Sequence, residues 1–147
     1  MERRAFIAAT FSVLAAPRAA GVGRVPRVGF LNEGAEPGSN PPRSRFEDGL
    51  REHGYVPGTS LVLEILCAED RLERLAELAA ELVCLRVDVI LAPSERSAMA
   101  ARQATRTIPI VMVLGIDPIR QGLITRLARP GGNVTGLTVD PGPEIIA

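Results

Sequence analysis

Short apolar runs alternate with amphipathic stretches along most of this 147-residue chain, and this alternation constrains the fold more than any other feature. The apolar runs predict strands at residues 27–31, 60–67, 87–92, 108–113 and 133–138. Helical patterns lie between them, at residues 41–53, 70–84 and 96–105, with a weaker one at 122–129. Strands that are apolar on both faces indicate a parallel sheet covered by helices on both sides. The pattern therefore predicts an α/β fold, a doubly wound, flavodoxin-like parallel sheet of about five strands.

Local signals define several of these helices. The first begins at Asn40 as N-cap with Pro41 after it, and Gly54 is expected to end it beside a solvated His53. Asp70 and Glu73 resemble a capping box that opens the next helix. That helix carries a stripe of apolar residues at helical spacing, which we interpret as core packing: Leu72, Leu75, Leu78, Ala79, Leu82 and Val83.

Residues 1–21 have the pattern of a secretory signal peptide, with two arginines, an apolar run and small residues at the end. The arginine pair leaves both Sec and twin-arginine export open, and either places the mature protein in the periplasm or otherwise outside the cytoplasm. An oxidising compartment permits a disulfide. Cys67 is expected to point inward from a strand and Cys84 outward from a helix, so we predict two free thiols.

Composition excludes several chemistries. All 17 basic residues are arginine, so neither a Schiff-base lysine nor a phosphate-loop lysine exists. The 17 acidic residues balance them, which argues against nucleic-acid binding. A single histidine and two cysteines do not predict a metal site, and no nucleophile has a base beside it. We therefore predict no metal, no cofactor and no catalytic residues.

The turn at residues 130–132, Pro-Gly-Gly, precedes the fifth predicted strand. Ligands of open α/β sheets bind beyond the carboxyl ends of strands, which is the opposite edge. We therefore interpret this turn as structural, with Gly131 at a position of positive φ.

The same rule places the ligand site at the loops that follow the strands. The candidate ligand-binding residues are Asn32, Ser94, Glu95, Gly115, Asp117, Gly136 and Thr138. Ser94 is either a plain helix N-cap or a ligand contact as well, beside amides that suit a carboxylate. Asp117 either meets a ligand ammonium or holds its own turn. Glu33 is expected to be solvated.

Four segments, "RVGFL", "LAELAAELVCLRVDVIL", "QATRTIPIVMV" and "IDPIRQGLITRLARPGGNVTGLT", closely resemble the substrate-binding proteins of ABC transporters with a type I periplasmic-binding fold. The resemblance implies that residues 25–139 are the N-terminal ligand-binding lobe and that residues 140–147 start the crossover to a missing second lobe. It also implies an amino-acid-like solute, in some members aromatic, held in an interlobe cleft, and an ABC permease as partner.

Two departures from that family stand out. Its members are roughly twice as long, and its small Thr or Ser dipeptide after the third strand is replaced in this chain by "PSERSA", with a charged Glu95 and Arg96. The alternatives are a small enzyme on a flavodoxin-like sheet and a non-functional truncated fragment. An uncovered apolar edge near the fifth strand would also favour self-association.

Overall fold

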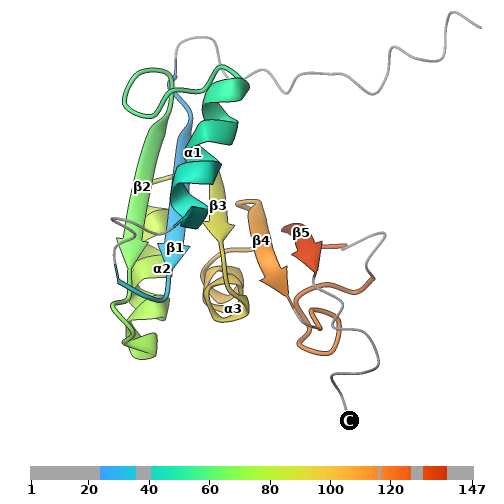
Figure 1. Cartoon of the computed structure of the whole chain (residues 1–147). Helices are drawn as coiled ribbons and strands as arrows, with labels where there is room; N and C mark the ends of the chain where they lie inside the picture. The colour runs from blue at the N-terminus through green and yellow to red at the C-terminus, as the bar shows by residue number, and fades with distance from the viewer. Residues whose placement is uncertain (1–23, 36–40, 116, 127–130, 139–147) are drawn as a thin grey trace, which may run out of the picture.

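In a computed structural model, the chain forms a five-stranded, all-parallel sheet with strand order β2-β1-β3-β4-β5 (Figure 1). The structure describes residues 24–35, 41–115, 117–126 and 131–138. Its elements are β1 (Arg27–Asn32), α1 (Pro41–Glu52), β2 (Val62–Cys67), the 3-10 helix η1 (Leu72–Arg74), α2 (Leu75–Cys84), β3 (Val89–Ala92), α3 (Glu95–Ala104), β4 (Ile110–Gly115) and β5 (Val134–Thr138). The predicted fold class is confirmed.

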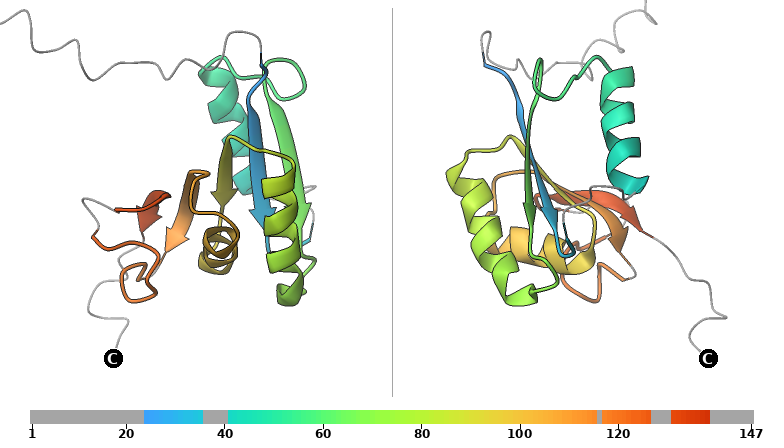
Figure 2. Two further views of the ribbon diagram at one scale, coloured as in Figure 1. Left: turned by 180° about the vertical axis from the view of Figure 1, so that it is seen from behind. Right: turned by 60° about the vertical axis from the view of Figure 1, so that its left-hand side comes forward.

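Helices cover both faces of the sheet, as expected for parallel strands (Figure 2). On one face, the ring of Phe46 in α1 lies 6.2 Å from that of Phe30 in β1. On the other face α2 and α3 pack against each other and the central strands. The buried core lies mainly on this second face and includes Leu31, Leu78, Ala79, Leu82, Ile90, Ala98, Ala101, Ile110, Met112 and Val134.

The approach of α2 to β1 depends on a glycine. A Cβ at Gly29 would lie 2.9 Å from Cδ2 of Leu82, closer than normal carbon contacts. Leu82 is fully buried, so the missing side chain at Gly29 lets this leucine fill the space over the central strand.

The first helix begins and ends as predicted within the described residues. Gly54 has φ +83°, and its N–H donates to the carbonyl of Arg51, while the N–H of Tyr55 donates to that of Leu50. These two bonds are a Schellman C-cap, in which glycine tolerates the left-handed conformation. His53 is exposed, as expected. The predicted N-cap, Asn40, lies outside the described residues.

The predicted capping box at Asp70 and Glu73 is wrong. Asp70 has φ +62°, whereas an N-cap residue requires extended backbone. The N–H of Asp70 donates to the carbonyl of Glu33, which ties this segment to the loop after β1. The chain therefore enters helix through η1, and α2 starts at Leu75 without a side-chain cap.

The predicted helix at residues 122–129 is also wrong over its described part, because residues 122–126 form turns and bends. Gly122 has φ +71°, and its carbonyl and that of Leu123 accept hydrogen bonds from the guanidinium of Arg102 in α3. Those carbonyls would otherwise accept the first bonds of a helix. Leu123 and Ile124 are buried, so the segment covers the sheet without helical structure.

The Gly-Gly turn lies before β5, as predicted, at the edge where the strands begin. Gly131 has φ +76°, which confirms its expected role. Gly132 has no positive φ, and a Cβ there would meet nothing within 4 Å. Pro130 lies outside the described residues.

Neither cysteine forms a disulfide, as predicted: Cys67 is partly buried in β2 and Cys84 is exposed at the end of α2. In the described part of the chain, no helix is long and apolar enough to cross a membrane. The expected leader at residues 1–21 and the expected crossover at 140–147 lie outside the described residues.

We predict that Gly136→Ala will lower the free energy of unfolding by about 2 kcal/mol, since strained backbone positions cost roughly 1–3 kcal/mol. Gly136 has φ +147°, and a Cβ there would collide with the backbone of Met112 on β4. Chemical denaturation would measure the change. Gly132→Ala is the matched control, and its effect should stay within about 0.5 kcal/mol. Equal effects of the two substitutions would contradict the close approach of β5 to β4.

Candidate ligand-binding site

All five strands run in the same direction, so their carboxyl ends meet at one edge of the sheet. The loops after β1, β3 and β4 lie at this edge, which we call the carboxyl edge. In the neighbouring strands β1 and β3, Phe30 pairs with Leu91. The chain therefore brings Asn32 and Glu33, which follow Phe30, next to Ser94 and Glu95, which follow Leu91.

Ser94 caps α3. Its hydroxyl accepts the backbone N–H of Ser97 at 3.2 Å, and the hydroxyl of Ser97 accepts the N–H of Ser94 at 3.2 Å. Ser97 is fully buried, so this capping box fixes the first turn of α3 against the core. The amides of Glu95 and Arg96 have no acceptor within the helix because they belong to its first turn. These two backbone amides are available to bind an anionic group.

Glu95 and Glu33 each hold one carboxylate oxygen away from solvent without a hydrogen-bond partner among the described residues. Both side chains are partly buried, and they follow adjacent strands. The expectation that Glu33 is solvated is therefore wrong. A buried carboxylate oxygen without a donor is costly, and a cationic or N–H-bearing ligand group would remove that cost.

Asp117 is exposed and holds its own turn, since its Oδ1 accepts the backbone N–H of Arg120 at 3.1 Å. Together with Met99 of α3, Arg120 and Gln121, it lines an open hollow of about 520 Å³. Asp117 therefore stabilises its own turn, which is one of its two predicted roles. The hollow also leaves its carboxylate accessible to a ligand.

The remaining candidates differ in their placement. The side-chain amide of Asn32 donates to the carbonyl of Ala35 at 3.0 Å and lies 4.0 Å from Sγ of Cys67, so it stabilises the loop after β1. Gly115 pairs with Thr138 at the ends of β4 and β5, beyond a bulge that follows Met112. Gly136 lies inside β5 opposite Met112, and its contact with β4 accounts for the glycine.

Sequence reasoning placed Glu33 in the loop after the first strand, directly after Asn32, but left it out of the ligand-binding residues because it was expected to be solvated. It also missed Met99, Arg120 and Gln121, which line a hollow together with Asp117. Among the described residues, no group of His, Cys, Asp or Glu could hold a metal ion.

The sequence is similar to those of known proteins over most of its length. The family model for ABC transporter substrate binding proteins matches residues 35–143, most of the chain. The chain belongs to this family. A tyrosine-binding protein from Clostridioides difficile is 34% identical over 105 residues, covering 69% of this chain and 30% of that protein.

Three solved structures illustrate the similarity in fold. A substrate-binding protein with adhesive properties from Clostridium difficile, in its ligand-free, open form, superposes with a TM-score of 0.72 at 29% identity, covering 83% of this chain and 43% of that one. An ABC domain from Streptococcus pneumonia in complex with L-Trp gives 0.71 at 27% identity, covering 78% and 39%. A conserved domain protein from Vibrio cholerae gives 0.76 at 29%, covering 84% and 42%.

This chain thus spans less than half the length of the relatives it matches. Relatives with a described role are substrate-binding proteins rather than enzymes, which agrees with the expectation of a binding function.

We predict that Ser94→Ala will lower the free energy of unfolding by about 1 kcal/mol, because it removes the N-cap of α3. Ser94→Thr retains a hydroxyl and should preserve most of the stability. Combining Ser94→Ala with Ser97→Ala should cost less than the sum of the single changes, since the two hydroxyls form one motif. Urea denaturation of the four variants tests this, and strict additivity would contradict the capping box.

Proposed function

We propose that the carboxyl edge of this sheet binds an amino-acid-like solute for an ABC importer. The observation that carries the proposal is that donors and an acceptor lie together at the start of α3. The donors are the free backbone amides of its first turn, and the acceptor is the partly buried carboxylate of Glu95. A zwitterionic amino acid presents a carboxylate and an ammonium on one carbon. Support also comes from family membership and from relatives described as binding tyrosine or L-Trp.

In the proposed binding mode, the solute carboxylate accepts the amides of Glu95 and Arg96 at the start of α3, with Ser94 beside it. The macrodipole of α3 favours a negative group at this end. The ammonium meets the carboxylates of Glu95 and Asp117. Asn32, Gly115, Gly136 and Thr138 remain proposed parts of the surrounding wall.

A second lobe would close over this edge and hold the solute in an interlobe cleft. A second lobe has room in the relatives, of which this chain covers 30% and 43%. The carboxyl edge by itself presents an open surface, whereas effective small-molecule sites bury most of their ligand. We therefore expect the 147-residue chain alone to bind its solute weakly.

The proposal includes export of the protein and delivery of its solute to a membrane transporter. The leader pattern at residues 1–21 supports secretion to the periplasm by the Sec or the twin-arginine route. The membrane partner is then an ABC permease, as implied by the family.

Glu95→Gln should weaken binding of L-tryptophan about tenfold, because hydrogen bonds to charged groups contribute roughly 1.5–3 kcal/mol. It should leave 3-indolepropionate, which lacks the amine, almost unaffected. Isothermal titration calorimetry of both ligands, extended to a panel of amino acids, would measure the preference.

Glu52→Gln is the matched control, because Glu52 is an exposed glutamate at the end of α1, towards the opposite edge of the sheet. Its effect should be negligible. Amino-acid binding that is indifferent to Glu95→Gln would refute the assignment of the ammonium, and absence of any binding across the panel would refute the proposed solute class.

The face of the sheet that carries α1 is open over β4 and β5, where no described helix lies (Figure 1). The alternation of side chains places Val111 and Leu137 on this face, and Leu137 is 70% exposed. We propose that this apolar surface promotes self-association.

Leu137→Ser should therefore shift the protein towards monomer. Light scattering coupled to size-exclusion chromatography, across a concentration series, would detect the shift. Tyr55→Ser removes another large exposed side chain, 45% exposed, in the loop between α1 and β2, at the other end of the strand order from β5, and should leave the distribution unchanged. A monomeric parent protein at all concentrations would contradict the proposal.

A further inference from the structure

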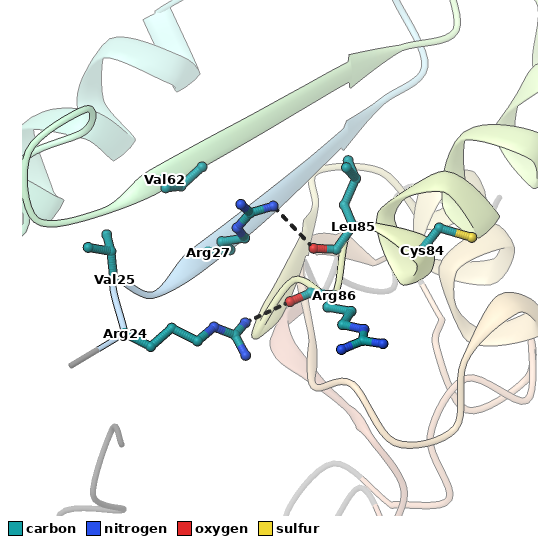
Figure 3. Close-up of a pocket in the computed structure, with 7 residues that line it drawn as sticks. All are labelled: Arg24, Val25, Arg27, Val62, Cys84, Leu85 and Arg86. Atoms are coloured by element: carbon teal, nitrogen blue, oxygen red, sulfur yellow. Dashed lines mark hydrogen bonds between the residues drawn. The ribbon is translucent and has the colours of Figure 1, made fainter. Parts of the chain in front are cut away.

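Three arginines surround an open hollow at the edge of the sheet opposite the carboxyl edge (Figure 3). The hollow has a volume of about 670 Å³ and is lined by Arg24, Arg27 and Arg86, with Val25, Val62 and Leu85 as apolar neighbours. Among the described residues, no acidic side chain belongs to this lining. The proposed solute site does not use any of these residues.

Two of the guanidinium groups are held in place. The guanidinium of Arg24 donates to the carbonyl of Arg86 at 2.9 Å and pairs with Asp88 at 3.2 Å. That of Arg27 donates to the carbonyl of Leu85 at 3.3 Å and lies 3.7 Å from Glu64. Two carboxylates thus face three guanidinium groups, which leaves one uncompensated positive charge at the hollow.

The third arginine stands where the backbone favours glycine. Arg86 follows the last turn of α2 with φ +53°, and its N–H donates to the carbonyl of Val83, while that of Val87 donates to Leu82. This is the same Schellman C-cap that ends α1, where the corresponding residue is Gly54. A side chain disfavours this left-handed conformation, which glycine adopts without that penalty.

The Arg86 guanidinium makes no hydrogen bond or ion pair with the described residues, and Figure 3 shows no bond from it to the groups drawn. Its side chain therefore does not offset the conformational cost through hydrogen bonds or ion pairs within this part of the protein. An unfavourable backbone position that persists without such a contact points to a role outside the fold.

We propose that this arginine hollow binds a phosphate group. Guanidinium groups bind the oxygens of phosphate through paired N–H donors, and two of the three are already fixed by carbonyl and carboxylate contacts. Arg86 supplies the uncompensated charge. The phosphate belongs either to a soluble phosphate compound or to the headgroup of an anionic phospholipid.

The test compares the full parent chain with Arg86→Gly in a chloride buffer of low ionic strength. Titration with inorganic phosphate by calorimetry reports the soluble source. Sedimentation with phosphatidylglycerol vesicles, against phosphatidylcholine vesicles, reports the lipid source. Arg86→Gly should weaken phosphate or vesicle binding about tenfold or more, since an Arg–phosphate contact is a strong charge-assisted bond.

The same variant separates binding from folding. Glycine suits φ +53°, so Arg86→Gly should keep or raise the melting temperature while binding is lost. Arg45→Gln, which removes an exposed charge from α1, should leave binding intact.

Two results would overturn the proposal. The first is no binding of the parent chain to either inorganic phosphate or anionic vesicles. The second is that Arg45→Gln weakens phosphate or vesicle binding as much as Arg86→Gly does, which would show that only the net charge of the protein matters.

Discussion

The common direction of all five strands is the constraint on which the rest of the structure depends. Each strand must be reached by a crossover that passes over a face of the sheet, so helices cover the faces and loops collect at the edges. The carboxyl ends of β1, β3 and β4 then lie side by side because of the strand order. Ser94, Glu95 and Asp117 lie at this edge for this topological reason, and the start of α3 adds the polarity of its amides.

Hydrophobic periodicity made most of this fold predictable from the sequence. Strand alternation is robust because each apolar run must be buried on both faces. The two errors concern segments where tertiary bonds replace helical ones. Asp70 looks like an N-cap in sequence, but its N–H is bonded to the carbonyl of Glu33, in the loop that follows β1. Residues 122–126 look helical in sequence, but the carbonyls of Gly122 and Leu123 accept hydrogen bonds from Arg102.

The candidate site was predictable to the level of loops rather than side chains. The rule for ligand edges selects the residues after each strand, and the cap at Ser94 follows directly from the Ser-x-x-Ser spacing. The rule does not reveal which carboxylates become buried on folding. The partial burial of Glu33 and the exposure of Asp117 reverse the ranking that sequence position suggested, because packing around each loop determines burial. Likewise, the strain at Arg86 becomes visible only once φ is known.

The central claim is that a solute meets the carboxyl edge at the start of α3, away from the Gly-Gly turn. Mapping the amide chemical-shift changes of the isotope-labelled chain during titration with L-tryptophan tests it most directly. We expect the largest changes at the amides of Glu95 and Arg96, with smaller ones near Asp117. Changes concentrated at Gly131, Gly132 and Asn133, with α3 unaffected, would contradict it.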